Sequence, residues 1–172
     1  MSQQILAYEI TKLSVAPTWE VAKEEWMLND VWISETPDTC TCGHYPIKEI
    51  CLLKNKLNGK YVPVGNCCVK KFMGLPSDLI FQAIKRIGLD INKALNVEAL
   101  NYAKGKGWIN DWEYGFYCNT FSKRKLSEKQ KAKRIQVNTM FLQRMSKPVI
   151  QTYANVAPVT PKAPIMSVLI PF

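Results

Sequence analysis

The chain has 172 residues, of which 47% are hydrophobic, and its 23 basic and 14 acidic side chains give a formal net charge of +9. This composition supports a folded core and argues against a globally disordered chain. No apolar run approaches the roughly 18 residues of a membrane helix, and the N-terminus lacks the pattern of a secretion signal. We therefore expect a cytoplasmic protein with no membrane partner.

The first 39 residues predict a strand and a helix. Apolar residues alternate irregularly with polar ones over 1–16, which favours a short strand or extended entry. Thr18 then stands where a helix N-cap is expected. The segment 19–32 after it mixes tryptophans with Glu20, Glu24 and Glu25, which predicts an amphipathic helix of about three turns.

Five of the six cysteines and the single histidine fall between residues 40 and 68. Within this segment, residues 49–65 read as two extended runs around Asn58-Gly59, the pair favoured in a tight type I′ hairpin turn. Cys67, Cys68 and Val69 then open a short helical turn that stops at Gly74. The segment 40–75 is thus expected to form a small module built on a β-hairpin.

The remainder is predicted to be mainly helical. Helices are expected over 76–88, with Ser77 as N-cap, over 90–107, and after the capping box of Ser127 and Gln130. The aromatic stretch 108–121 has no clear period, and the proline-rich end is expected to be extended. We divide the chain into an N-terminal strand and helix segment (1–39), a zinc-finger module (40–75), a helical region with a basic segment (76–147) and an extended tail (148–172).

The clustered cysteines favour a metal site, because thiols stay reduced in the cytoplasm and disulfides are rare there. A turn at Cys40-Thr41-Cys42-Gly43, a hairpin, and a cysteine at the start of a helical turn follow the plan of a treble-clef zinc finger. Adjacent cysteines seldom bind one ion together, so Cys68 is preferred over Cys67. The expected ligands of one structural Zn²⁺ are Cys40, Cys42, Cys51 and Cys68, with His44 or Cys67 as substitutes. Buried reduced cysteines and a redox or catalytic thiol site are the alternatives.

This segment resembles a group of small bacterial and phage zinc-finger proteins, which share a pattern C-x-CG…I, an Asn or His before a turn, and VG-x-x-C. The matching residues are Cys40, Cys42, Gly43, Ile47, Asn55, Val64, Gly65 and Cys68, with Cys51 where some members carry His. The later LSEKQKAKRI is similar to a segment that follows such fingers in phage-encoded proteins. Tyr45-Pro46 and the doubled cysteine depart from the pattern. The resemblance implies a zinc site and a phage or bacterial origin.

The net positive charge suits nucleic acid or an acidic protein surface. Seven basic residues crowd the segment 123–134, and two more follow the cysteine pair. The predicted nucleic-acid-binding residues are Lys70, Lys71, Lys123, Arg124, Lys125, Lys129, Lys131, Lys133 and Arg134. A solvated helix face is the alternative for the basic segment. The neighbouring aromatic residues could stack on bases or belong to the core.

We expect no enzymatic activity, because the sequence lacks a phosphate-binding glycine loop, a nucleophile elbow and a two-histidine motif. Overall, an α+β protein is predicted, in which a treble-clef-like zinc finger with a β-hairpin packs with about four helices and a proline-rich tail. Its expected function is binding of nucleic acid through a basic surface. The alternative is a phage-encoded protein-interaction module that binds and inhibits a host enzyme or defence complex.

Overall fold

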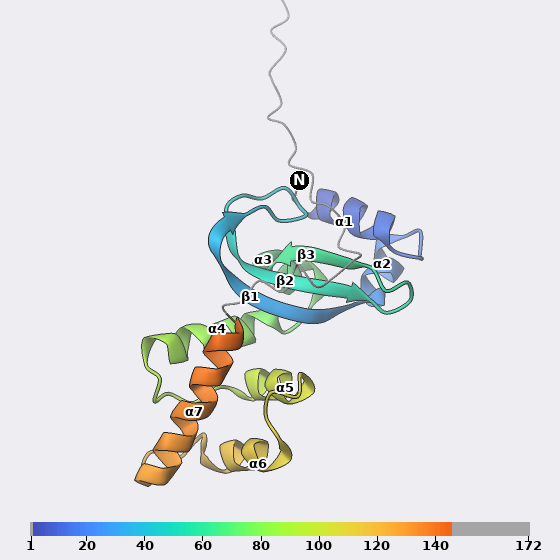
Figure 1. Cartoon of the computed structure of the whole chain (residues 1–172). Coiled ribbons are helices and arrows are strands. Elements are labelled where there is room, and N and C mark those ends of the chain that lie inside the picture. Colours follow the sequence, from blue (N-terminus) through green and yellow to red (C-terminus); the bar gives the residue numbers. More distant parts are fainter. Residues whose placement is uncertain (1, 146–172) are drawn as a thin grey trace, which may run out of the picture.

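The computed structural model describes residues 2–145, so the predicted tail 148–172 lies outside the described residues. Within this range the protein is α+β, as predicted, with seven α-helices and a three-stranded antiparallel sheet of order β1-β2-β3. Figure 1 shows α1 and α2 at one end of the molecule and α5 and α6 at the other, with the sheet and α4 between them.

The N-terminal segment is a helix, α1 (Ser2–Leu13), so the predicted strand is wrong. Leu6 and Ile10 are fully buried, and Leu13 packs against the same core. These residues are spaced i, i+4 and i+7, which places them on one face of a helix. A short helix α2 (Trp19–Ala22) and a 3₁₀ turn (Lys23–Glu25) follow.

The second half of the helix predicted over 19–32 is instead part of strand β1 (Trp26–Asp38). It pairs with β2 (Ile47–Asn55), with Val31 opposite Cys51 and Trp32 opposite Ile50. The glutamates of this segment favour a helix locally, but strand pairing and the burial of Trp26 and Trp32 outweigh that preference. The helical prediction therefore holds only for residues 19–25.

The predicted hairpin is confirmed. Strand β2 pairs antiparallel with β3 (Tyr61–Gly65), and five residues connect them. The predicted type I′ turn is not formed, because that turn requires positive φ at both central residues. Of the five connecting residues only Gly59 has a positive φ, of 71°. Oδ1 of Asn55 accepts the N–H groups of Leu57 and Asn58.

The two faces of the hairpin enter different environments. Cys51 and Leu53 point into the main hydrophobic core, whereas Ile50 and Leu52 form a smaller cluster with Trp32. The main core also contains buried residues of α1 and of α4 to α7. The cysteine segment and the helical region therefore share one core.

The predicted helical turn at the cysteine pair is also confirmed. It comprises α3 (Asn66–Cys68) and a π-helical turn (Val69–Met73) that ends at Gly74. Helix α4 (Ser77–Leu89) follows, with Ser77 as its first residue rather than its N-cap. The buried Ser77 hydroxyl instead donates to Oδ1 of Asn66 at 2.7 Å. The Asn66 amide donates to Glu49 at 2.7 Å, and Glu49 forms an ion pair with Lys85 of α4.

Three further helices complete the fold. Helix α5 (Val97–Gly105) is shorter than the predicted 90–107 and is capped by Asn96, whose side chain accepts the N–H of Ala99. Helix α6 (Asp111–Thr120) occupies the unassigned aromatic stretch. Helix α7 (Glu128–Met145) follows the capping box, and reciprocal hydrogen bonds between Ser127 and Gln130 confirm that box. None of the helices in residues 2–145 has the length and apolar character that a bilayer-spanning helix needs.

Candidate metal centre

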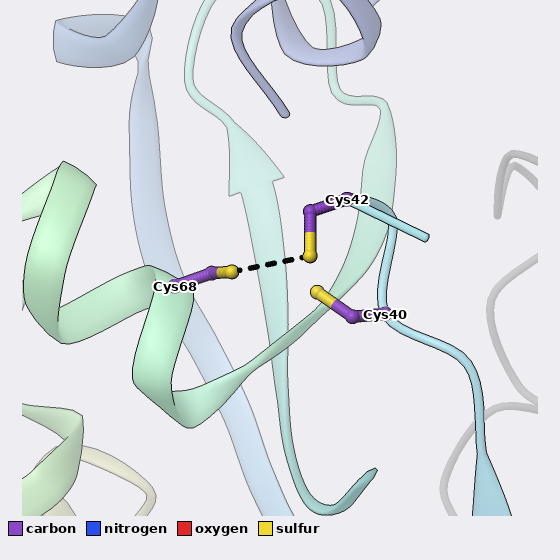
Figure 2. Close-up of side chains that lie close together, drawn as sticks. All are labelled: Cys40, Cys42 and Cys68. Carbon is purple, nitrogen blue, oxygen red and sulfur yellow. Dashed lines mark hydrogen bonds between the residues drawn. The ribbon is translucent and has the colours of Figure 1, made fainter. Parts of the chain in front are cut away.

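Three cysteine sulfurs converge beside the hairpin. Cys40 and Cys42 lie on the connection between β1 and β2, and Cys68 lies on α3. Their Sγ atoms all lie within 4.8 Å of one another, and all three side chains are buried. Figure 2 shows Cys68 facing the two loop cysteines, with 3.4 Å between the sulfurs of Cys42 and Cys68. The fold thus gathers three of the predicted ligands.

A tight backbone turn positions the two loop cysteines. The N–H of Gly43 donates to the carbonyl of Cys40 at 2.7 Å, and the N–H of Cys40 donates to the carbonyl of His44 at 2.9 Å. Gly43 has a φ of 84°, which a side chain disfavours. The glycine therefore lets the chain reverse directly after Cys42 and turn both sulfurs inward.

Hydrogen bonds polarise the sulfur of Cys40. The Cys68 thiol contributes most, and the N–H groups of Cys42 and Gly65 add to it, so that the pKa of Cys40 falls to about 6. The Gly65 N–H lies 3.2 Å from the sulfur. The pKa of Cys68 is raised, chiefly by its bond to Cys40 and by burial, and burial raises the pKa of Cys42. Cys40 is thus the sulfur of this group that the surrounding hydrogen bonds stabilise as a thiolate.

This donor set fits a tetrahedral thiophilic ion. Zinc binds thiolate sulfur at about 2.3 Å, which places sulfurs of one tetrahedral site roughly 3.8 Å apart. The observed separation of 3.4 Å and the limit of 4.8 Å bracket this value. Cys40, Cys42 and Cys68 could therefore hold one metal ion with little movement, and one coordination position would remain.

The other predicted ligands lie outside this group. Cys51 is fully buried on β2, and burial raises the pKa of its thiol to about 12. It pairs across the sheet with Val31 and Val64 and does not converge with the three sulfurs. His44 and Cys67 are exposed. The structure therefore brings together three of the four preferred ligands.

A cleft of about 640 Å³ opens beside the three sulfurs. His44, Cys67 and the three convergent cysteines all line it. Pro37, Pro46, Ile47 and Phe72 form much of the remaining wall, together with Lys48, Glu49 and Lys71. His44 and Cys67 thus lie on the solvent side of the cluster.

The predicted nucleic-acid-binding residues differ in their environments. Within residues 2–145, no ion pair engages Lys71, Lys123, Arg124, Lys125 or Lys129, and all five are exposed. Lys70 pairs with Asp78, Lys131 with Glu128, and Lys133 with Glu113, at 2.7–2.8 Å. The free positive charge therefore concentrates at residues 123–125 and at Lys129.

Arg134 is the exception, because only 6% of its surface is exposed. Its guanidinium donates to the carbonyl of Thr120 at 2.5 Å and lies 5.8 Å from the Tyr117 ring centroid. Its side chain therefore packs between α6 and α7, and is not part of an open basic face.

The aromatic stretch divides between core and surface. Tyr117 is fully buried, and Trp108 packs edge-on against Tyr102 and Phe141. Trp112 is 65% exposed and stacks on Phe116 with ring centroids 5.6 Å apart. One tryptophan of this stretch is thus available at the surface.

The sequence analysis did not identify the hydrogen-bonding roles of two residues beside the three cysteines. Gly65 supplies an N–H to the Cys40 sulfur, and Asn66 links the start of α3 to Glu49 and Ser77. Their position directly before the cysteine pair is the only signal in the sequence. Comparison of the chain with protein-family models, curated proteins and solved structures found no match.

Proposed function

We propose that the protein is a non-enzymatic zinc-binding protein that binds nucleic acid through its basic surface. The observation that carries the metal assignment is the convergence of three buried thiols from a tight turn and a helical turn that flank one hairpin. That order of elements supports a treble-clef-like finger as the proposed architecture. In the cytoplasm the thiols would stay reduced and available for the ion.

The proposed fourth ligand is His44. Its carbonyl accepts the N–H of Cys40, which keeps the residue within one turn of the first two sulfurs, and it lines the cleft beside them. Cys67 lines the same cleft, but adjacent residues on a helical turn point in different directions and Cys68 already faces the cluster. A site of three cysteines and one histidine is a common structural zinc site.

The proposed role of the ion is structural. With four protein ligands it has no open position for substrate. Glu49, the acidic residue of the cleft, is already engaged by Asn66 and Lys85. Zinc would hold the connection between β1 and β2 against α3, and so fix the hairpin on the helical region.

Metal analysis of the full chain tests this assignment. We expect about one zinc per chain after purification without added metal. Replacing zinc with Co²⁺ should give thiolate-to-cobalt absorption with the intensity of three thiolates. In His44→Ala the number of thiolates bound to Co²⁺ should stay at three, and the affinity for the metal ion should fall. Less than about half an equivalent of zinc in the wild type would refute the assignment.

The nucleic-acid assignment is supported by the net charge of +9 and by the exposed basic residues of the connection between α6 and α7. Such side chains contact phosphates, and their binding weakens steeply as salt rises. Fluorescence anisotropy with labelled single-stranded and double-stranded oligonucleotides over a salt series tests it. Affinity should fall linearly with salt on logarithmic axes, and no binding at low salt would refute the assignment.

A protein-interaction function is the second candidate, and the cleft beside the cysteines is the observation that favours it. Its prolines, Ile47 and Phe72 offer apolar contacts, and Lys48 and Lys71 offer charge at the wall. A phage-encoded inhibitor of a host enzyme or defence complex would use such a surface. Capture from nuclease-treated lysate, repeated with Phe72→Ala, tests it. A partner that is retained after nuclease and lost in the variant would support this function.

A further inference from the structure

A second, smaller cleft of about 300 Å³ lies between α7 and the connections that precede α5 and α7. Its lining residues are Asn92, Lys123, Arg124, Leu126, Lys131 and Arg134. Four of these six are cationic and none is acidic. The volume is at the small end of the roughly 300–1,000 Å³ of ligand pockets, which suits one compact anion with a small attached group.

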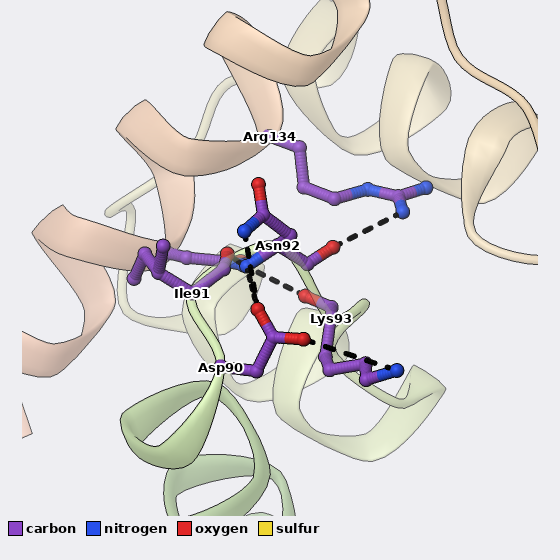
Figure 3. A network of polar contacts seen from close by, with 6 residues as sticks. Asp90, Ile91, Asn92, Lys93 and Arg134 are labelled. Carbon is purple, nitrogen blue, oxygen red and sulfur yellow. Dashed lines mark hydrogen bonds and ion pairs between the residues drawn. The ribbon is translucent and has the colours of Figure 1, made fainter.

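Arg134 is the buried cation of this pocket. Its guanidinium makes two hydrogen bonds to backbone carbonyls, to Thr120 at 2.5 Å and to Asn92 at 3.5 Å, and the second is drawn in Figure 3. Its Nε–H is buried and has no acceptor among residues 2–145. No carboxylate of the described chain forms an ion pair with it. A buried charge is costly unless it is paired, and residues 2–145 supply no carboxylate that pairs with this one.

The acidic residue drawn in Figure 3 is occupied elsewhere. Asp90 accepts the backbone N–H of Asn92 at 3.0 Å and its side-chain amide at 3.1 Å, and pairs with Lys93 at 3.9 Å. These contacts direct its carboxylate into its own loop. Asp90 is therefore not the missing partner of Arg134.

The same loop is held in place by α7. The amide of Asn138 donates to the carbonyls of Ile91 at 2.7 Å and Lys93 at 2.8 Å. Asn138 is fully buried, and its Oδ1 accepts the hydroxyl of Tyr117 at 2.7 Å. The wall that carries Asn92 is thus preorganised, whereas Lys123 and Arg124 are exposed and can close over a ligand.

We propose that this pocket binds a phosphate group, with Arg134 as the fixed cation and the unpaired Lys123 and Arg124 around the remaining oxygens. Lys131, which pairs with Glu128, adds positive charge to the wall. Guanidinium groups match the geometry of phosphate oxygens. That the phosphate belongs to a nucleic-acid chain rests on the proposed function, whereas phosphate binding itself does not.

The Nε–Hε signal of Arg134 tests the pocket directly. A buried Nε–H exchanges slowly with water, so ¹⁵N-labelled full-length protein should give a distinct cross-peak, assigned by its loss in Arg134→Lys. Titration with inorganic phosphate should shift this peak to saturation, whereas chloride at matched ionic strength should not. No shift, or an equal shift with chloride, would overturn the proposal.

Oligonucleotide affinity provides the second measurement. The double variant Lys123→Gln/Arg124→Gln removes two exposed charges at the pocket, and Lys56→Gln/Lys60→Gln removes two exposed charges at the turn between β2 and β3. In Figure 1 the connection between β2 and β3 lies at the end of the sheet near α2, whereas the connection between α6 and α7, which lines the pocket, lies at the other end of the molecule. The pocket variant should weaken binding about tenfold and reduce the salt slope by about one per lost phosphate contact, and the control should have a much smaller effect.

The outcomes separate the two proposals. Equal losses in both variants would overturn the pocket as the site for nucleic acid and leave the proposed function standing. A phosphate-induced shift without any oligonucleotide binding would support the pocket and refute the nucleic-acid function. In that case titration with nucleoside mono- and diphosphates identifies the ligand class. Absence of both signals would refute both.

Discussion

The hydroxyl of Tyr117 on α6 donates a hydrogen bond of 2.7 Å to Oδ1 of Asn138 on α7. The same hydroxyl accepts the backbone N–H of Leu95 at 2.8 Å, and both Tyr117 and Asn138 are fully buried. Two helices and the connection before α5 thus meet at one oxygen atom. Because no water reaches these groups, each depends on the others for its hydrogen bond.

Tyr117→Phe should lower the free energy of unfolding by about 1–3 kcal/mol, because it leaves the Leu95 N–H and the Asn138 oxygen without a partner in the core. Urea denaturation measures this. Tyr114→Phe is the matched control, since its hydroxyl bonds to Asn101 at an exposed site. The control should change stability by less than about 0.5 kcal/mol, and equal effects would contradict the role given to Tyr117.

Cys68→Ser should reduce bound zinc below about half an equivalent, because a serine hydroxyl is a poor zinc ligand and two sulfurs do not hold the ion. Its midpoint of thermal unfolding should fall together with the loss of metal. Cys67→Ser is the control, since Cys67 is exposed and outside the convergent group. It should retain about one equivalent of zinc. Loss of zinc in Cys67→Ser alone would reverse the assignment of the doubled cysteine.

Gly43→Ala should destabilise the protein by about 1–2 kcal/mol, because an alanine disfavours positive φ. The cost is conformational, since a Cβ at this position would meet no atom within 4 Å. Gly115→Ala, in the middle of α6, is the opposite case. It also meets no atom within 4 Å, and alanine favours a helix over glycine by roughly 0.5–1 kcal/mol. In thermal unfolding with zinc present, Gly43→Ala should lower the midpoint and Gly115→Ala should raise it. A higher midpoint in Gly43→Ala would contradict the role given to Gly43 in the turn.

Glu25 should make stability depend on pH in the acidic range. Burial alone would raise the pKa of its carboxyl, but hydrogen bonds from the Val15 N–H, the Asn55 amide and the Ala16 N–H together hold the pKa below its usual value. Because the pKa is lowered in the folded state, the Glu25 carboxylate stabilises the protein at pH values above its ordinary pKa of 4.5. This contribution is lost as the pH falls through the lowered pKa.

Thermal unfolding over about pH 7 to 3 measures this effect. Glu25→Gln should be less stable than the wild type at neutral pH, and the difference should shrink as the solution becomes acidic. Glu9→Gln, at a partly exposed position of α1, is the control, and its stability should depend on pH in the same way as that of the wild type. A constant difference between Glu25→Gln and the wild type would show that the carboxylate charge plays no part.

The convergence of three cysteines was largely predictable, because these residues lie close to recognisable local structures. Cys40 and Cys42 precede a glycine, and Cys68 opens a helical turn after a hairpin marked by Asn58-Gly59. The same reasoning could not show that Cys51 lies outside the group of convergent sulfurs. Its orientation depends on which face of β2 meets the core and on how far it lies from the turn. Those are properties of the assembled sheet and cannot be read from spacing.

The N-terminal third was predicted poorly for a related reason. The spacing of Leu6, Ile10 and Leu13 is helical, and a count of that period would have identified α1. For β1 the local signals were misleading, because its pairing partner β2 begins nine residues after its end. A strand whose stability comes from a later segment carries little evidence of itself in its own residues.

Arg134 shows why the burial of charged residues is hard to predict from the sequence. Together with Val137, Asn138, Phe141 and Met145 it forms the buried side of α7. Of the apolar residues Ile135, Leu142 and Met145 on this helix, only Met145 is buried. Buried polar residues shift the apparent direction of a helix face, and their partners lie on other elements.

The chain of contacts from Ser77 through Asn66 and Glu49 to Lys85 has a practical consequence. It crosses residue 75, where the composition changes from cysteine-rich to helical. Cutting the chain at that point would separate Asn66 from Ser77 and Glu49 from Lys85, and would expose the core that Cys51 shares with α4. We therefore expect that neither piece would fold in isolation. We also expect that removal of a bound metal by a chelator would destabilise α4.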